Sequence, residues 1–359
     1  MITRYQKVDT LYPNIMTLKY AAEIIQKGGL VAFPTETVYG LGANAFNEYA
    51  LKKIFYAKGR PADNPLILHI ASIKDIVDVA SYVPAEAKKA IKAFWPGPLT
   101  IVLPKTANVL PQASAGLPTV AVRMPSHPIA LNLIKLAKNP VVAPSANLSG
   151  KPSPTMGYHV LKDLRGRIDM VIDGGPCRFG LESTVVDFTE EIPTILRPGA
   201  VTKEMLESVL GHVIYDPALK NSQAAPKSPG VKYLHYAPKG DMYLLKGDNS
   251  QLIASKLNEL IQKYKDSGKR VALIATEEVV QMLAKENSNY PANQQPNYIG
   301  SLGSKYEQEL IASRLYHLLR NCDKFNIDIV LTEGISEKGL GAAIMNRLIK
   351  ASGNRVINV

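Results

Sequence analysis

The chain alternates short apolar runs with amphipathic stretches over most of its length. Apolar runs of four or five residues predict buried strands, and apolar positions spaced three and four apart predict helices. Before about residue 210 this pattern predicts helices over 18–27, 48–57, 85–93 and 127–137. It predicts strands over 30–33, 66–70, 99–103, 120–123, 141–143, 170–173 and 184–188. Their mixed order indicates an α/β or α+β sheet domain.

After about residue 240 the alternation becomes more regular. It predicts strands over 242–245, 271–275 and 327–332, with helices over 251–265, 277–284, 306–320 and 342–351. Strands that alternate with helices are typical of a small parallel sheet with helices on both faces. The run GLGAA at Gly339 is too short to indicate a dinucleotide site.

Between these parts, residues 211–240 lack a periodic pattern. The segment contains four prolines and the run SPGVKYLHYAP, which carries the rings of Tyr233, His235 and Tyr236. Flexible linkers are usually bland and polar, so this run is expected to be ordered. Because 359 residues exceed what one core usually serves, we predict three parts: domain 1–210, linker 211–240 and domain 241–359.

Composition narrows the class of protein. Hydrophobic residues make up 46% and charged residues 20%, as in globular proteins. The start of the chain has no signal-peptide core, and no apolar run reaches 18 residues, so we expect a cytoplasmic protein without membrane contact. Two distant cysteines and six scattered histidines indicate neither a disulfide framework nor a zinc site.

The positive charge is concentrated in the first part. Residues 1–240 carry 27 Lys and Arg against 18 Asp and Glu, out of a total net charge of +11. A basic domain predicts an anionic partner. Nucleic acid, nucleotide phosphates and a solvated basic surface all remain open.

Two segments share one plan, a buried strand cut by proline and followed by small polar groups. They are LVAFPTETVYGLGANA at 30–45 and PVVAPSANLSGKPSPT at 140–155. Open α/β sheets bind ligands at the carboxyl ends of strands, so the polar halves are candidate binding loops. The first supplies Thr35 and Thr37, although the TxT pattern alone is explained more readily by a capped turn. The second supplies Ser145, Asn147, Ser149 and Ser153.

Basic residues accompany these loops. In AKGRPADNPLILHI, Lys58 and Arg60 point the same way and can hold phosphate oxygens, unless they form a solvated loop. In LPTVAVRMPSHP, Thr119 and Arg123 share one strand face. An arginine among apolar residues needs an anion, which is either a substrate carboxylate or an internal acid.

The remaining motifs, together with the catalytic motifs that the sequence lacks, narrow the kind of reaction to be expected. WPGPLTIVLP is explained mainly by packing, while GLESTVVDF and ILRPGAVT bring Ser183 and Arg197 to strand ends. The sequence contains no Walker A motif and no apparent Ser/His/Asp arrangement. Lys, Arg, Ser, Thr and Asn suit a reaction driven by positioning and charge neutralisation, such as transfer at a nucleotide phosphate.

The order of these motifs resembles that of one known family. The motifs are PTETVYGLGANA, KGRPADNPL, WPGPLT, VRMPSHP, APSANLSGKPSPT, STVVDF and LRPGAV. They resemble the YrdC-like threonylcarbamoyl-AMP synthases, and SPGVKYLHYAP with a following α/β domain is similar to the longer, two-domain form. The resemblance implies a YrdC-like twisted mixed sheet as the catalytic domain and a smaller Rossmann-like domain after it.

The resemblance also implies a nucleotidyltransferase reaction. L-Threonine, bicarbonate or carbon dioxide, and ATP would give threonylcarbamoyl-AMP and pyrophosphate. A separate transferase would use the product to make N6-threonylcarbamoyladenosine in tRNA. Mg²⁺ would be carried with ATP, with no protein metal ligands assigned and no organic cofactor.

Residue roles follow from the same resemblance. The catalytic residues would be Lys58, Arg60, Ser145 and Asn147. The threonine pocket would be Thr35, His69, Arg123 and Ser183. Further nucleotide contacts would be Asn64, Thr119, Ser153 and Arg197, and Tyr233 and His235 would belong to a lid.

Two other functions remain to be weighed. A non-catalytic module that binds structured RNA would use the basic first domain and would lose affinity steeply with salt. Carbamoyl transfer through a carbamoyl-adenylate is disfavoured, because the chain lacks the zinc-finger-like and acylphosphatase-like segments that accompany it. Direct contact with tRNA, the role of residues 241–359 and the oligomeric state stay open.

Overall fold

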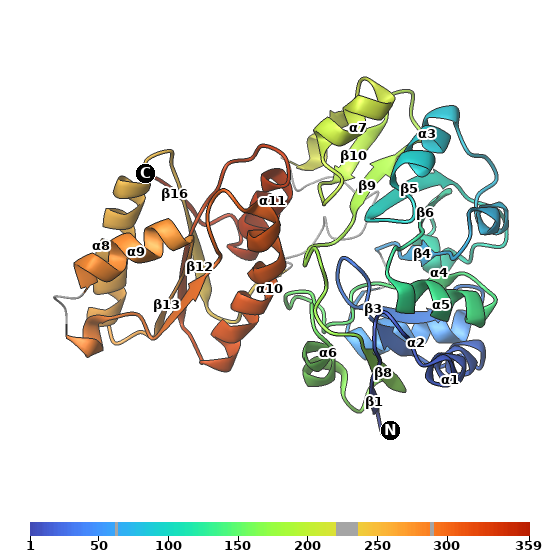
Figure 1. Cartoon of the computed structure of the whole chain (residues 1–359), viewed down its shortest axis with the longest axis horizontal. Helices are drawn as coiled ribbons and strands as arrows, with labels where there is room; N and C mark the ends of the chain where they lie inside the picture. Colours follow the sequence, from blue (N-terminus) through green and yellow to red (C-terminus); the bar gives the residue numbers. More distant parts are fainter. Residues whose placement is uncertain (62–63, 220–235, 288–290) are drawn as a thin grey trace. The chain divides into compact units, whose positions relative to one another are not determined.

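The computed structural model describes residues 1–61, 64–219, 236–287 and 291–359 (Figure 1). These residues form two compact units. The first contains residues 1–149 and 153–219, and the second contains residues 236–359 together with 150–152. In the part of the chain described, no helix combines the length and the apolar composition needed to cross a bilayer.

The first unit is built on an eleven-stranded mixed sheet with the order β1-β8-β2-β3-β7-β4-β6-β5-β9-β10-β11. Its strands are β1 Arg4–Lys7, β2 Val31–Phe33, β3 Gly40–Asn44, β4 Ile67–His69, β5 Leu99–Pro104, β6 Thr119–Arg123, β7 Val141–Val142, β8 Met170–Asp173, β9 Thr184–Asp187, β10 Thr194–Arg197 and β11 Ile214–Tyr215. Its helices are α1 Ile15–Gln26, α2 Glu48–Lys58, η1 Ile73–Asp78, α3 Ala85–Phe94, α4 Pro111–Ser114, α5 Pro128–Ala137, α6 Gly157–Leu164, α7 Lys203–Leu210 and η2 Pro217–Leu219. The predicted mixed-sheet α/β fold is confirmed, and in this unit every helix and strand predicted by range lies within three residues of its expected bounds.

The sequence pattern missed three strands of this sheet, β1, β3 and β11, and β3 is the one that bears on the site. Residues 34–45 were expected to form a polar turn, but β3 pairs antiparallel with β2, with Gly42 opposite Val31 and Gly40 opposite Phe33. At Gly42 a Cβ atom would lie 2.7 Å from the Phe33 ring and 3.1 Å from a methyl group of Val141. Glycine therefore permits the packing here, although it weakens the apolar alternation from which strands are predicted.

The first unit has apolar clusters on both faces of its sheet. Along β2, Ala32 belongs to the larger cluster, whereas Val31 and Phe33 face helices α1 and α5 in a second cluster. This explains the uninterrupted apolar run in the sequence, because a strand buried on both faces shows no alternation. A third cluster is small and consists of Ile67, Val102, Ala121, Val185 and Leu196. It matters below because the predicted site residues surround it.

The second unit is a five-stranded parallel sheet with the order β14-β13-β15-β12-β16. Its strands are β12 Asp241–Lys246, β13 Val271–Ala275, β14 Tyr298–Ser301, β15 Ile329–Glu333 and β16 Val356–Asn358. Its helices are α8 Ser250–Asp266, α9 Glu277–Asn287, η3 Ala292–Gln294, α10 Gln308–Lys324 and α11 Gly341–Ala351. Helices α8 and α9 cover one face and α10 and α11 the other (Figure 1). The predicted Rossmann-like parallel domain is confirmed, except that its two edge strands, β14 and β16, were not predicted.

Candidate functional site

Several predicted site residues share one face of the large sheet. His69 of β4 and Thr100 of β5 both lie opposite Arg123 of β6, and Val185 of β9 lies opposite Thr100. Residues directly opposite each other on neighbouring strands point to the same face. His69, Thr100 and Arg123 therefore lie on the face that carries the small apolar cluster defined above.

Arg123 is buried, with 4% of its surface exposed, and each of its nitrogens has a neighbour. Its Nε donates to the carbonyl oxygen of Gly97 at 3.2 Å, and its Nη1 donates to Oγ1 of Thr37 at 2.8 Å. Its Nη2 lies 2.6 Å from Oε1 of Glu36. The sequence left open whether an internal acid satisfies Arg123, and the structure supplies Glu36. Since a guanidinium has five N–H groups, these contacts leave one on each terminal nitrogen uncommitted among the described residues.

Glu36 is ionised at neutral pH despite its burial. Burial disfavours the charged carboxylate, but the positive charge of Arg123, 2.6 Å away, outweighs it and holds the pKa of Glu36 below its usual range. Glu36 and Arg123 thus form a buried pair without net charge.

Thr35 is buried within the turn that follows β2. Its Oγ1 donates to the carbonyl oxygen of Val38 at 2.6 Å and accepts from the main-chain nitrogens of Thr37 and Val38, each at 3.2 Å. These hydrogen bonds form the capped turn that was the alternative to a binding loop in the sequence analysis. The turn carries Thr37 and Glu36 to Arg123, while a direct contact of Thr35 with a ligand stays a prediction.

His69 is neutral. Its Nδ1 lies 3.2 Å from the carbonyl oxygen of Ile67. Burial and the positive charge of Arg123 lower the pKa of His69 to about 3. A neutral imidazole adds a hydrogen-bonding group to this face without adding a second positive charge beside Arg123.

Ser183 and Arg197 are in direct contact, although the sequence assigned them to different substrates. Oγ of Ser183 lies 2.7 Å from Oγ1 of Thr100 and accepts from Nη2 of Arg197 at 3.2 Å. Nε of Arg197 donates to the carbonyl oxygen of Ser183 at 3.0 Å. The predicted threonine pocket and the predicted nucleotide site therefore meet at Ser183.

Lys58 contacts the second of the two proline-interrupted segments. It is the last residue of α2, and its Nζ donates to the carbonyl oxygens of Ser145 at 2.5 Å and Asn147 at 2.8 Å. Gly40 forms an antiparallel bridge with Ser145, and the nitrogen of Ala146 donates to the oxygen of Tyr39 at 2.8 Å. The two segments that share one sequence plan are thus neighbours, with Lys58 buried against the second.

The remaining predicted nucleotide residues are more dispersed. Nη2 of half-buried Arg60 donates to the oxygen of Asn64 at 3.2 Å, and Ser153 Oγ donates to Glu182 Oε1 at 2.5 Å. Oδ1 of buried Asn64 has no hydrogen-bond partner in the described chain. Thr119 begins β6, four residues or about 13 Å from Arg123 along the strand.

The lid residues Tyr233 and His235 lie outside the described residues. Within the described ranges, no group of three or more His, Cys, Asp or Glu side chains could hold a metal ion. Cys177 is buried, and burial raises the pKa of its thiol, so it is a weak nucleophile at neutral pH.

Sequence reasoning gave no role to Thr100 or to Glu36. WPGPLTIVLP was explained by packing, and Trp95 is indeed buried, with its Nε1 donating to Leu99 at 2.7 Å. Within this motif, however, Thr100 is the polar residue that faces Ser183. A threonine inside an otherwise apolar strand was the available signal. Glu36 was detectable as an acid between two threonines already proposed for binding.

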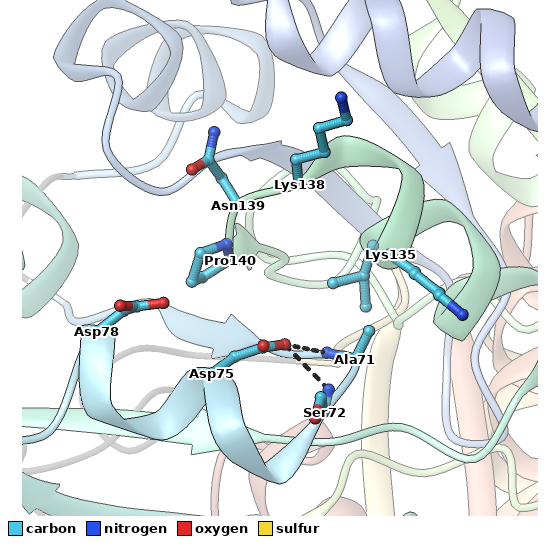
Figure 2. Close-up of a pocket in the computed structure, with 9 residues that line it drawn as sticks. Ala71, Ser72, Asp75, Asp78, Lys135, Lys138, Asn139 and Pro140 are labelled. Carbon is cyan, nitrogen blue, oxygen red and sulfur yellow. Dashed lines mark hydrogen bonds between the residues drawn. The ribbon is translucent and has the colours of Figure 1, made fainter.

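A pocket of about 520 Å³ is lined by other residues (Figure 2). Asp75 and Asp78 of η1 line one side, and Lys135, Lys138 and Asn139 at the end of α5 line another. The carboxylate of Asp75 accepts from the main-chain nitrogens of Ala71 and Ser72 at 3.3 and 3.0 Å. Asp75 thus caps η1, and none of the predicted site residues lines this pocket.

The structure is that of an α/β protein. Buried basic and hydroxyl side chains from several of its strands lie together in the first unit. Comparison with known proteins identifies the family. Residues 23–199 match the family described as "Telomere recombination" (Sua5–YciO–YrdC), and residues 201–353 match the "Threonylcarbamoyl-AMP synthase, C-terminal domain". The chain belongs to the Sua5–YciO–YrdC family and carries the C-terminal domain of its threonylcarbamoyl-AMP synthases.

Similar proteins match over nearly their whole length. The threonylcarbamoyl-AMP synthase of Pyrococcus abyssi is 49% identical over 95% of this chain and 96% of its own. That of Bacillus subtilis is 46% identical over 97% of this chain and 96% of its own. The crystal structure of the P. abyssi Sua5 protein complexed with L-threonine has a TM-score of 0.91 at 47% identity, covering 99% of this chain and 100% of that chain.

Proposed function

We propose that this protein is a threonylcarbamoyl-AMP synthase, which joins L-threonine, bicarbonate or carbon dioxide, and ATP into threonylcarbamoyl-AMP and pyrophosphate. The product would be consumed by a separate transferase that modifies tRNA, and the reaction would take place in the cytoplasm. ATP would enter as its magnesium complex, with Mg²⁺ held mainly by the triphosphate. Direct contact with tRNA is not required by this scheme.

The observation that carries the proposal is the presence of two buried cationic clusters in one unit. One contains Arg123, His69, Ser183 and Arg197 on a single sheet face. The other contains Lys58 against Ser145 and Asn147. A reaction that joins an amino acid to a nucleotide needs one binding site for a carboxylate and another for phosphates.

The Arg123 cluster supports threonine binding. The two uncommitted N–H groups of Arg123 suit the carboxylate of an amino acid. Neutral His69 and the Ser183 hydroxyl would bond the hydroxyl and amine of threonine, with Thr35 in the neighbouring turn. The amine must lose its proton before it attacks carbon dioxide, and the Glu36–Arg123 pair, which has no net charge, does not oppose that loss.

The Lys58 cluster supports nucleotide binding. Lys58 and Arg60 would neutralise charge that develops on pyrophosphate as the carbamate oxygen attacks the α-phosphorus. Ser145, Asn147 and Ser153, with Asn64, Thr119 and Arg197, would hold the rest of the nucleotide. Bringing three small reactants together can contribute on the order of 7 to 11 kcal/mol in favourable cases.

The catalytic domain and the linker would have separate roles in the reaction. Residues 1–210 would bind threonine, ATP and bicarbonate or carbon dioxide. Residues 211–240, with Tyr233 and His235, would close the site against water. Exclusion of water matters because both the carbamate and the mixed anhydride hydrolyse easily. A chain that ends after Pro238 is expected to keep activity, whereas one that ends before Gly211 is expected to lose it. Equal activity of the two truncated proteins would contradict a role for residues 211–240 in closing the site.

A non-catalytic RNA-binding module is disfavoured by burial. Lys58, Arg123 and Arg197 are 3, 4 and 4% exposed and engaged in hydrogen bonds. Phosphates of folded RNA are contacted by exposed side chains. The basic groups of the candidate site instead suit a small ligand that enters the protein.

Release of pyrophosphate tests the proposal. Purified protein supplied with ATP, threonine and bicarbonate should release pyrophosphate, and omission of threonine or of bicarbonate should abolish the release. Release that does not depend on threonine, or the absence of release by folded protein, would contradict it.

A further inference from the structure

Glu36 has a role that the proposed reaction does not by itself assign. We infer that Glu36 is a positioning residue: its carboxylate holds the Arg123 guanidinium in the orientation that accepts the carboxylate of the amino-acid substrate. This inference rests on the proposed function and adds a determinant of threonine binding to the same site. It begins from the 2.6 Å contact between Oε1 of Glu36 and Nη2 of Arg123, both about 5% exposed.

Glu36 is itself held firmly. Its carbonyl oxygen accepts from the nitrogen of Phe179 at 2.9 Å. The residues on either side belong to one hydrogen-bonded turn, in which Oγ1 of Thr35 bonds Thr37 and Val38. A carboxylate on a segment fixed in this way can act as a reference point for a longer and more flexible arginine.

The contacts of Arg123 show what Glu36 contributes. Gly97 and Thr37 bind Nε and Nη1 through neutral oxygens, so Glu36 is the only acid paired with this guanidinium among the described residues. Three contacts at three nitrogens fix both the position and the plane of the group. Without Glu36, one terminal nitrogen would lose its partner and a buried charge would lose its counterion, which is strongly unfavourable.

The opposite role, in which Glu36 competes with the substrate for Arg123, fits the geometry less well. A carboxylate that binds an arginine end-on needs two parallel N–H groups, and Glu36 engages one nitrogen through one oxygen. One N–H on each terminal nitrogen stays uncommitted in the described part of the chain. Positioning predicts that loss of Glu36 weakens threonine binding, whereas competition predicts that it strengthens binding.

The test compares Glu36→Gln, Glu36→Asp and wild type. Glu48→Gln serves as a matched control, because Glu48 pairs with Lys52 on the exposed surface of α2. Threonine Kd is measured by calorimetry, and the KM values for threonine and ATP by pyrophosphate release. We expect Glu36→Gln to raise threonine Kd and KM by about 30-fold or more, the usual effect of breaking a buried charge pair, and to leave the ATP KM within about twofold. Glu36→Asp should recover part of the loss, and Glu48→Gln should match wild type.

A double-mutant cycle separates positioning from a general loss of structure. If Glu36 acts through Arg123, Glu36→Gln should have little further effect on threonine Kd in an Arg123→Lys background. An unchanged threonine Kd in Glu36→Gln, or a tighter one, overturns the inference. If Glu36→Gln does not fold, Glu36→Asp is judged by the same criterion. Wild type without threonine-dependent pyrophosphate release would instead defeat the proposed function, so the two failures are distinguishable.

Discussion

Three basic residues of the site, Lys58, Arg123 and Arg197, are buried and already hydrogen-bonded within the protein. Lys58 donates to two carbonyl oxygens, and Arg197 donates to Ser183. Such residues cost free energy to bury unless each polar group has a partner, so their positions are fixed before a ligand arrives. Substitution should therefore affect turnover or binding according to which substrate each residue meets.

Lys58→Ala should lower kcat by about 100-fold or more, because removing a charge-stabilising donor at a phosphoryl centre usually costs that much. Lys52→Ala on the exposed side of the same helix is the control. Steady-state kinetics with ATP and threonine both saturating measure the effect. A loss of less than about threefold would remove Lys58 from catalysis.

Thr35→Ala should act mainly on threonine. The variant is expected to raise threonine KM by about tenfold while kcat falls by less than about threefold, since an interaction made equally in ground and transition states changes KM. Thr35→Ser keeps the hydroxyl that bonds Val38 and should restore wild-type KM. Equal losses of kcat in Lys58→Ala and Thr35→Ala would contradict the division of roles.

His69 should make stability depend on pH. Its folded pKa of about 3 lies below the ordinary value of 6.5, so between these values the unfolded chain binds more protons and stability rises with pH. Below pH 6.5 wild type should lose about 1.4 kcal/mol per pH unit that His69→Gln does not lose. Denaturant unfolding of both proteins from pH 7 to 5 measures the difference. Parallel stability curves would show that His69 is not buried in its neutral form.

Which residues belong to the site was easier to predict from the sequence than which residues they contact. Arg123 was predicted from one strand, but its contacts come from Glu36, Thr37 and Gly97, which lie far from it along the chain. Likewise, no local pattern indicates that Ser183 contacts Arg197. Periodicity describes which face a side chain occupies, whereas pairing depends on how distant strands are ordered in the sheet.

At the scale of elements, the buried strands and amphipathic helices were predictable because their apolar pattern is strong. Two of the missed strands have weak patterns: β1 is mostly exposed, and β3 contains two glycines. Helices α6 and α7 were also missed, although both are amphipathic. The β2–β3 pair nevertheless places the turn that holds Thr35 and Glu36. Its packing should therefore matter for the whole site.

Gly42→Ala should destabilise this hairpin. The added Cβ would meet the Phe33 ring and Val141, and such overpacking typically costs about 1 to 3 kcal/mol. Phe33→Leu in the same background should recover part of the loss by relieving the closer contact. Chemical denaturation of the two single variants and the double variant measures the coupling. Additive losses would mean that Phe33 and Gly42 do not pack as described.

At the scale of the molecule, the chain divides into two units, each with its own sheet and its own apolar cluster. The alternation of strands and helices predicted the parallel sheet of the second unit, but the sequence contains no motif that assigns it chemistry. Its apolar cluster, which includes Leu257, Leu273 and Leu331, is sufficient reason to expect independent folding.

Residues 241–359 expressed alone should unfold cooperatively on heating. Leu331→Asp, which places a charge at a fully buried position of β15, should abolish the transition and serves as the control. Circular dichroism during a thermal ramp measures both. A gradual change without a transition in the unsubstituted fragment would show that the second unit depends on the first.

The most direct test of the central claim is the composition of the product. Protein incubated with ATP, labelled threonine and labelled bicarbonate should form an AMP conjugate that contains threonine and the bicarbonate carbon in equal amounts, detectable by mass spectrometry. An AMP conjugate that contains threonine but no bicarbonate carbon would contradict the account, because the enzyme would then activate the amino acid itself instead of its carbamate.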